Sequence, residues 1–384
     1  MGRQLTELVV DYGDYRLQAR LQQRLAKEKN CWQDFPSVLH CNCSMLPGYK
    51  FVDLNRYAGE GATRADFGNL SHCHNHWTCP TCSAYYLSRL GNGISLLLAE
   101  KDLEDVWAFS LTLTIPHNRF DSARSRLELL KACKRRIKNS RVQRMAKAIG
   151  ICGSITATEC TYSRIHGWHF HQHVVFLIPR ANWHYVEDFA ERYSQTWRRA
   201  VVTLGGYPED YGQHSISQPV YLSRTEDGQV LRVNDGRYIL DFGSEIVKPD
   251  GKSNAATTGA SVFSLIEGTD EDFDKFVEFA KAVKGAQRVT CSNGLRRRVD
   301  ELLQESKENF QSANTEREVV CSWCAADWRE IIVAEKVTGI YFRMEFLQIV
   351  SDGSTLREID ALCRLWSIPL PLPPQRQFPK SQAA

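Results

Sequence analysis

The fold is decided by residues 153–178, GSITATECTYSRIHGWHFHQHVVFLI. Two stretches within this segment, GSITATECTYS (153–163) and HFHQHVVFLI (169–178), have the alternating or apolar character of β-strands. The link between them, Arg164–Gly167, is too short for the crossover of roughly a dozen residues that parallel strands require. The two strands must therefore be antiparallel neighbours, and they place an antiparallel hairpin at the centre of the protein.

Further strands and helices extend outward from this hairpin. Residues 106–115, VWAFSLTLTI, alternate between polar and apolar side chains and predict a half-buried strand. Helical periodicity follows at 122–148 and again at 183–202. Another strand is predicted at 216–223, before a helix that begins near Tyr238. This order of strand, helix, two strands, helix, strand and helix indicates an α+β fold.

Three histidines, His169, His171 and His173, occupy alternate positions of the second hairpin strand. Their side chains point to one face, about 7 Å apart in succession, so neighbouring imidazoles can share an ion and the outer pair cannot. His171 therefore belongs to either pair, and Glu159 on the partner strand is close enough in register to add a carboxylate. The alternative to a metal site is that the histidines simply belong to a polar face of the sheet and that Glu159 is a solvated strand residue. Such a set with open positions suits Mn²⁺ or Mg²⁺ acting on phosphate, and also hydrolytic zinc.

Three segments resemble motifs of the HUH replication initiators of rolling-circle plasmids. They are FSLTLT (109–114), TECTYSRIHGWHFHQHVVF (158–176) and KGAQRVTCSNGLR (284–296), and they occur in the order of the family. The resemblance extends over about residues 73–298. Taken together, the three motifs are far more specific than any single His-x-His.

The resemblance implies both a fold and a set of ligands. The fold is an HUH-type central antiparallel β-sheet flanked by helices. The ligands of a catalytic Mn²⁺ or Mg²⁺ are His171, His173 and Glu159, with His169 as an alternative ligand. Gln172 departs from the family, which has a bulky apolar residue there. Because its side chain faces away from the ligands, we expect weaker packing and intact chemistry.

A strand that is nicked and later resealed needs a covalent intermediate, which a tyrosine hydroxyl can form as a phosphotyrosine. In the family this tyrosine begins a helix after the last core strand, and Tyr238 matches that position. Tyr221 is the competing candidate for the nucleophile. Tyr238 could instead be a helical tyrosine that packs into the core. Asp241 stands where the family usually has lysine. Lys248 offers a replacement cation, and Asp241 or Glu245 offers a group that assists termination.

The chain has thirteen cysteines and no export signal, which favours reduced thiols and metal binding over disulfides. Cys79 and Cys82 have the C-x₂-C spacing of a zinc knuckle, and Cys73 lies six residues upstream of Cys79. We expect a structural zinc ion bound by these three thiolates, with Cys43 as the fourth ligand. The other candidates for the fourth ligand are Cys41, His72, His74 and His76.

A net charge of +3 says little about nucleic acid, so the position of the cations matters more. Lysines and arginines gather on one face of the predicted helix 122–148, and such a patch can neutralise DNA phosphates. A second basic cluster lies at Arg296–Arg298. For each of the two clusters, the alternative to DNA binding is an ordinary solvated surface. We expect DNA to contact the first cluster at Lys134, Arg135, Arg136 and Lys138.

These patterns divide the chain into three expected parts. Residues 1–100 form an N-terminal helix and a Cys/His-rich zinc-binding module, and residues 101–300 form the HUH endonuclease domain. Residues 301–384 form a helical C-terminal region with a disordered, proline-rich tail that begins at Ile368. No apolar run is long enough for a signal peptide or a membrane span, so we expect a cytoplasmic protein.

The expected function is that of a rolling-circle DNA replication initiator. It nicks and rejoins one strand at a specific site through a 5′-phosphotyrosine, and it leaves a 3′-OH primer. Its partners are then single-stranded or cruciform origin DNA and the replication helicase and polymerase of the host, with no membrane. The alternatives are a transposase or relaxase of the same chemistry, and a zinc-stapled DNA-binding regulator that lacks nuclease activity.

Overall fold

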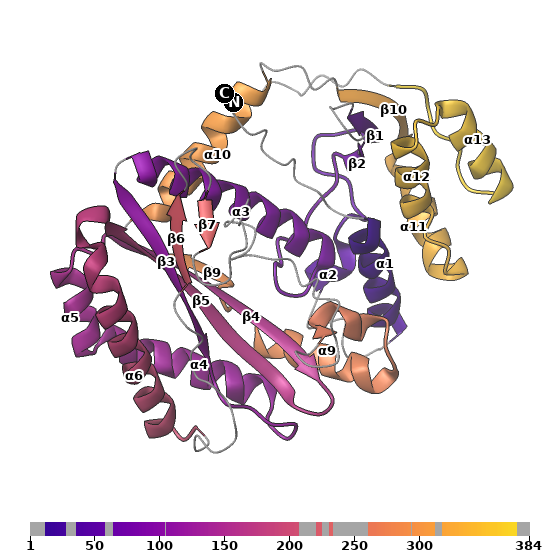
Figure 1. Ribbon diagram of the computed structural model, residues 1–384. Coiled ribbons are helices and arrows are strands. Elements are labelled where there is room, and N and C mark those ends of the chain that lie inside the picture. The colour runs from indigo at the N-terminus through magenta and orange to yellow at the C-terminus, as the bar shows by residue number, and fades with distance from the viewer. Residues whose placement is uncertain are drawn as a thin grey trace. The chain divides into compact units, whose positions relative to one another are not determined.

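The computed structural model of this chain is shown in Figure 1. The residues it describes are 12–27, 36–57, 64–103, 105–206, 220–224, 230–232, 260–292, 294–311 and 317–374. The chain forms two compact units, one within residues 86–305 and the other within residues 9–85 and 306–384. A search of the described helices finds none that combines the length and the apolar character needed to cross a bilayer.

The first unit is built on a seven-stranded sheet in the order β7-β6-β3-β5-β4-β8, with β9 paired to β4. Every strand pair in it is antiparallel, which confirms the α+β class. The strands are β3 (Val106–Thr114), β4 (Gly153–Ser163), β5 (Gly167–Pro179), β6 (Val220–Arg224), β7 (Val230–Arg232), β8 (Ala260–Ser261) and β9 (Val289–Cys291).

Helices cover both faces of this sheet (Figure 1). They are α3 (Pro80–Leu103), which enters the unit at Tyr86, and α4 (Ala123–Lys138), α5 (Arg141–Ala148), α6 (Val186–Thr203), α9 (Asp270–Ala282) and α10 (Leu295–Gln311), with short 3₁₀ turns at Arg180–Tyr185 and Val262–Ile266.

The β4–β5 hairpin fixes the centre of the sheet. The two strands pair along their whole length, and Glu159 lies directly opposite His171. Gly167, where β5 begins, has a φ of +78°, a conformation that favours glycine. A Cβ atom at this position would clash with the carbonyl oxygen of Asn118, so glycine also allows the loop after β3 to lie against the hairpin.

The two faces of the sheet are covered by different helices. Ala157 and Val175 belong to an apolar cluster with side chains of α3 and α10, which places these helices on one face. Phe170 stacks on Phe279 of α9, and Phe176 contacts aromatic rings of α6, which places these helices on the other face. Helix α4 contacts α6, α9 and β5, so it belongs to this second layer.

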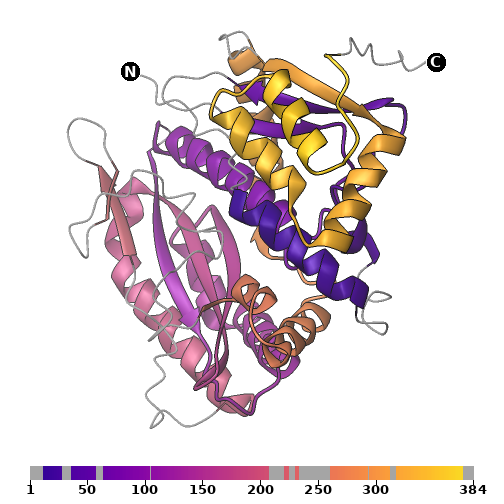
Figure 2. The same ribbon diagram turned by 90° about the vertical axis from the view of Figure 1, so that its right-hand side faces the viewer.

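The second unit joins the beginning and the end of the chain. Its three-stranded sheet has the order β10-β1-β2, and β1 pairs antiparallel with β10. Figure 2 shows its later helices, in orange and yellow, beside these strands. Its elements are α1 (Tyr12–Lys27), α2 (Pro36–His40), β1 (Phe51–Tyr57), β2 (Arg64–Gly68), β10 (Arg317–Cys324), α11 (Ala325–Thr338), α12 (Phe342–Ser351) and α13 (Leu356–Leu365).

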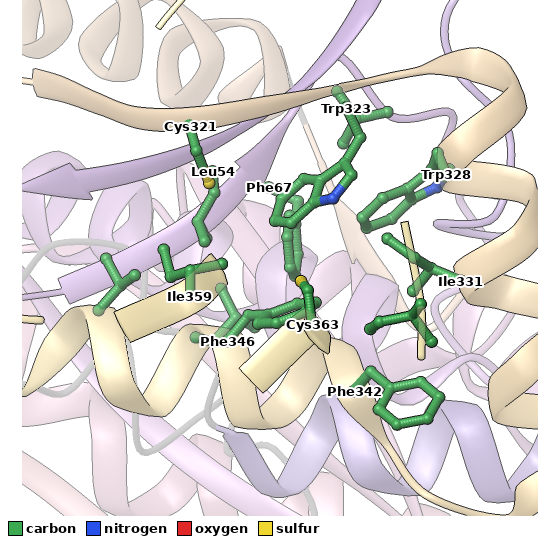
Figure 3. Packing of buried hydrophobic residues seen from close by; sticks show 14 of the residues in the cluster. Leu54, Phe67, Cys321, Trp323, Trp328, Ile331, Phe342, Phe346, Ile359 and Cys363 are labelled. Atoms are coloured by element: carbon green, nitrogen blue, oxygen red, sulfur yellow. The ribbon is translucent and has the colours of Figure 1, made fainter. Parts of the chain in front are cut away.

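This pairing corrects two expectations about the ends of the chain. The consecutive parts 1–100 and 301–384 are not separate, because strands from both form one sheet over a common core (Figure 3). The start of the proline-rich tail is also packed: Ile368 is buried, and Leu372 exchanges backbone hydrogen bonds with Ser322. Residues 375–384 lie outside the described residues.

A buried ion pair ties the second unit together. Arg343 on α12 and Glu335 on α11 are almost fully buried, with 2.8 Å between Arg343 Nη2 and Glu335 Oε2. The backbone N–H of Arg343 donates to the other carboxylate oxygen, and Arg343 Nη1 donates to the carbonyl of Asn42. Each charge is thus neutralised and hydrogen-bonded, as burial of charge requires.

Glu335→Gln should destabilise the protein by roughly 3–5 kcal/mol, because it leaves the buried Arg343 guanidinium without a counter-charge. Urea denaturation followed by tryptophan fluorescence measures the change. Glu318→Gln is the matched control, since Glu318 pairs with Arg56 at a carboxylate that is 56% exposed. The control should cost less than about 1 kcal/mol. Equal losses in the two variants would contradict this account of the buried pair.

Candidate metal centres

One candidate centre lies on the inner strands of the large sheet. Glu159 on β4 and His171 and His173 on β5 lie an even number of residues from Ala157 and Val175 on the same strands, which pack against α3 and α10, so all three point to that same face. Glu159 Oε2 lies 3.0 Å from His171 Nε2 and 3.6 Å from His173 Nε2. One ligand atom from each residue fits within 4.8 Å of the others. The structure therefore brings together the three ligands that the sequence suggested.

The electrostatics of this centre favour a charged carboxylate. Burial alone would raise the pKa of Glu159, but hydrogen bonds from His171 and His173 outweigh it and hold that pKa below its usual range. Thr112 Oγ1 lies 3.1 Å from His173 Nδ1. When Nδ1–H donates to this hydroxyl, Nε2 keeps its lone pair free for a cation. Two imidazole nitrogens and one carboxylate can thus hold a divalent ion with open positions.

A row of stacked imidazoles leads away from this centre. His169 stacks on His171 with 4.9 Å between ring centroids, and His117 stacks on His169 at 4.7 Å. His169 does not belong to the group of three converging ligands, so the structure favours the pair His171 and His173. His117 was not predicted as a site residue, because its only signal in the sequence is a position three residues after β3 ends.

Gln172 is on the opposite face, as expected from strand alternation. Its side chain is buried, and its Nε2 donates to Thr158 Oγ1 at 3.0 Å. The polar group of Gln172 is therefore hydrogen-bonded to the neighbouring strand. Its burial next to this partner leaves the ligand face unaffected.

The expected nucleophile cannot be placed relative to this centre. Tyr238 lies outside the described residues, as do Asp241, Glu245 and Lys248. The backbone of Tyr221 is described and lies on β6, paired with Phe109 of β3. The assignment of Tyr238 remains a prediction.

The basic cluster on α4 is not on the ligand face, because α4 belongs to the opposite layer. Lys134 is half-buried and its Nζ donates to Thr290 Oγ1 at 3.0 Å. Burial lowers the pKa of Lys134. Because its side chain is half-buried, it is less accessible to phosphate than its exposed neighbours. Arg135, Arg136 and Lys138 are exposed. The second cluster, Arg296–Arg298, forms ion pairs with neighbouring carboxylates.

A second candidate centre is formed by four thiols of the other unit. Cys41 Sγ lies 3.5 Å from Cys82 Sγ and 3.6 Å from Cys79 Sγ, and Cys73 Sγ lies 3.7 Å from Cys82 Sγ. All four sulfur atoms fit within 4.8 Å of one another. Cys79 and Cys82 are held at the start of α3, where Cys79 precedes the first helical residue, Pro80. Such a set suits a soft cation.

The fourth thiol of this group is Cys41, and the expectation of Cys43 is wrong. Asn42, between the two cysteines, has a φ of +57°, so the chain turns sharply there. Cys41 is buried among the other thiols, whereas Cys43 Sγ lies 3.5 Å from Gln22 Oε1. Alternation in sequence could not separate the two residues, because the turn decides which thiol points inward.

The thiols and one nearby histidine shift each other's ionisation. Hydrogen bonds from Cys73 and Cys79 lower the pKa of Cys41 to about 6. Burial raises the pKa of Cys79 well above its ordinary value. Hydrogen bonds to the sulfur of Cys41 and then of Cys82 raise the pKa of His72 to about 9. The site therefore stabilises some thiolates at neutral pH, which is a condition for metal binding.

Comparison with known proteins adds little to these sites. No protein-family model matches the chain, and no solved structure matches it either. A neomycin resistance protein from Streptomyces cyanogenus is 23% identical over 287 residues. That match covers 56% of this chain and 66% of the other protein, so the chain spans slightly less than two thirds of the length of that relative.

Cys41→Ala should remove the metal of the thiol centre, because three thiolates leave the fourth position of a closed site empty. We expect the metal content of the purified protein to fall by one equivalent per chain, measured by inductively coupled plasma mass spectrometry. Cys43→Ala is the matched control and should keep the full content. A loss of metal in Cys43→Ala, with Cys41→Ala unchanged, would reverse the assignment.

His171→Ala should abolish binding of Mn²⁺ at the sheet, measured by isothermal titration calorimetry. Its loss removes a direct ligand, so we expect an effect beyond the roughly 10- to 100-fold that the loss of a group hydrogen-bonded to a ligand causes. His169→Ala removes the stacked neighbour and should bind Mn²⁺ within a few-fold of the wild type. Comparable losses in both variants would show that the ligand pair is His169 and His171.

Proposed function

We propose that this protein is a metal-dependent endonuclease that nicks and rejoins single-stranded DNA, in the manner of the HUH rolling-circle replication initiators. The observation that carries the proposal is the placement of Glu159 opposite His171 on paired strands, with His173 on the same face. An antiparallel sheet with these ligands on two inner strands is consistent with an HUH-type arrangement. The three sequence motifs around these strands support the same proposal.

The two donor sets differ enough to favour different ions. Nitrogen and oxygen donors with open positions fit Mn²⁺ or Mg²⁺, whereas four thiolates in a closed set fit structural zinc. We infer a catalytic Mn²⁺ or Mg²⁺ at Glu159, His171 and His173, and zinc at the four cysteines. When bound, the catalytic ion polarises a phosphate oxygen of the DNA.

Tyr238 is our candidate for the nucleophile. Its phenol oxygen gives up its proton and forms a bond to the scissile phosphorus as the bond from phosphorus to the 3′ oxygen breaks, and the departing 3′ oxygen takes up a proton. The 5′ end then stays on the protein as a phosphotyrosine, and the free 3′-OH is available as a primer. Attack of a 3′-OH on the phosphotyrosine reverses these bond changes and rejoins a strand.

An exposed aromatic side chain on the loop after β3 suits a single strand better than a duplex. The row of His171, His169 and His117 ends in the loop after β3, and Phe120 follows His117 by three residues in the same loop. Phe120 is 81% exposed, and the Arg119 guanidinium lies 4.6 Å from the centroid of its ring. An unpaired base can stack on such a ring while a nearby cation meets the backbone.

The loop that contains Phe120 is held by hydrogen bonds and an ion pair. Arg126 on α4 is buried, its Nη1 donates to the carbonyl of Pro116, and its Nη2 lies 3.5 Å from Asp121. The backbone N–H of Phe120 donates to Asn118 Oδ1. A loop held by these contacts loses little conformational entropy when it binds a ligand.

We propose that the exposed cations of α4 bind DNA outside the metal centre. Because α4 is on the opposite layer from the ligands, we assign Arg135, Arg136 and Lys138 to DNA that flanks the scissile site. The substrate is then single-stranded or cruciform origin DNA, and the host's replication helicase and polymerase use the exposed primer. A transposase or relaxase has the same chemistry and differs in the DNA that it cuts.

The proposal predicts a covalent adduct between the protein and an oligonucleotide. Incubation with labelled single-stranded origin DNA and Mn²⁺ should give a species that migrates with the protein in a denaturing gel. Tyr238→Phe should reduce the adduct by roughly 10³-fold or more, because it lacks the attacking hydroxyl. Tyr221→Phe is the matched control and should form the adduct as the wild type does.

Each contrary outcome has a clear meaning. An adduct that persists in Tyr238→Phe and disappears in Tyr221→Phe would move the nucleophile to β6. A wild-type protein that binds the oligonucleotide and never forms an adduct would contradict nicking, and would favour the zinc-stapled regulator. If Glu159→Ala formed the adduct in the presence of Mn²⁺ as well as the wild type does, the assigned metal ligands would be contradicted.

A further inference from the structure

Three consecutive helices at the end of the second unit have a geometry that the function above does not use. Helix α11 ends at Thr338, where Gly339 caps it with a φ of +77°, and α12 begins three residues later. A turn of four residues, 352–355, then separates α12 from α13. Gly353 in this turn has a φ of +95°. Two short helices joined by a turn of this length, with glycine in it, are typical of a helix-turn-helix.

The second helix of the pair has a well-defined start. The Glu358 carboxylate accepts a hydrogen bond from the backbone N–H of Thr355, and the backbone N–H of Glu358 donates to the carbonyl of Thr355. The carboxylate also accepts a hydrogen bond from the Thr355 hydroxyl at 2.9 Å. This capping box fixes where α13 begins and uses the only acidic side chain of its first turn.

Buried side chains fix α13 against α12 and the sheet. Ile359 and Cys363 on α13 have no exposed surface, and they share one apolar cluster with Phe346 and Leu347 of α12 (Figure 3). The turn is held as well, because Arg56 on β1 donates to the carbonyl of Ser354 at 3.1 Å. The pair of helices is therefore a rigid element of the unit.

The outer face of α13 has a pattern suited to the major groove of DNA. Arg357 and Arg364 are seven residues apart, so they lie on the same side of the helix, two turns from each other. Both are exposed, and no ion pair is found for either within the described parts of the chain. Ala361, between them, is small and exposed, which lets a helix approach base edges closely. Leu365 at the end of the face is 73% exposed.

We propose that α12 and α13 form a helix-turn-helix that binds double-stranded DNA, with α13 in the major groove. Arginine recognises guanine through two acceptors on the base edge, and a small apolar side chain fits beside a thymine methyl group. Arg357 and Arg364 are about 10 Å apart along the helix, close to the rise of roughly three base pairs. We assign these two arginines to base contacts.

Duplex DNA explains this surface better than a protein partner. The face has two cations for which the described residues supply no ion pair, and one large apolar residue, Leu365, so it offers little apolar area for a protein interface. The position of Arg357 in the first turn also agrees with the way recognition helices contact bases near their N-termini. This site is separate from the metal centre of the sheet and does not depend on the nicking proposal.

Selection from a random duplex library tests the proposal with the full-length protein. We expect the wild type to enrich a defined motif that contains guanine at positions roughly three base pairs apart. Arg357→Ala and Arg364→Ala should each lower the affinity for that motif by roughly 5- to 150-fold, and should relax the preference at one position each. Fluorescence anisotropy measures the affinities, and circular dichroism checks that the helices are retained.

A charge-matched variant separates recognition from general attraction. Arg329 and Lys336 on α11 are also exposed, so Arg329→Ala/Lys336→Ala removes the same charge from the same unit as Arg357→Ala/Arg364→Ala. The α11 variant should keep the motif and lose at most a few-fold in affinity. Enrichment of no duplex sequence by the wild type, or equal losses in the two double variants, would overturn the proposal.

The two proposals fail in different ways. Duplex selection without a tyrosine adduct would overturn nicking and leave the helix-turn-helix in place. If the protein formed the adduct on single strands and selected no duplex, the helix-turn-helix proposal would be overturned and the nicking proposal would remain. In Arg357→Ala/Arg364→Ala, adduct formation on a single-stranded oligonucleotide should remain at the wild-type level.

Discussion

The pairing register of β4 with β5 is the constraint on which the candidate chemistry depends. Because side chains alternate along a strand, a slip of one residue would turn Glu159 away from the histidines. The register is fixed by the short connection and by apolar packing further along the same face, where Ala157 and Val175 meet α3 and α10. Packing at one end of the hairpin thus determines which ligands converge at the other.

The second unit depends on a contact of another kind, between residues far apart in the chain. Strand β1 pairs with β10, and the buried pair of Arg343 and Glu335 adds a hydrogen bond to the carbonyl of Asn42. Asn42 is the residue whose turn directs Cys41 toward the other thiols. The end of the chain therefore helps to shape the loop that forms the thiol centre.

Local pattern was sufficient to predict the hairpin, the face shared by His171 and His173, and the grouping of the C-x₂-C thiols, because each depends on neighbours in sequence. It could not separate Cys41 from Cys43, since a single left-handed residue decides the direction of the thiol. Nor could it predict that β1 pairs with β10, or that Lys134 is half-buried against Thr290, because both depend on distant segments. The sequence predicts a helical C-terminal region without a helix-turn-helix, since the glycine of the turn gains meaning only beside two packed helices.

If both proposals hold, one chain recognises DNA in two physically different ways. A metal centre that polarises phosphate acts on a group common to every nucleotide, so it supplies chemistry with little choice of sequence. Base edges are available to a helix only in the intact major groove, whereas a tyrosine needs a strand that is unpaired and accessible. A protein that must cut one site therefore gains selectivity by reading duplex DNA with α13 and cutting single-stranded DNA at Glu159, His171 and His173. The separation of these tasks between two units follows from the incompatible forms of DNA that each one requires.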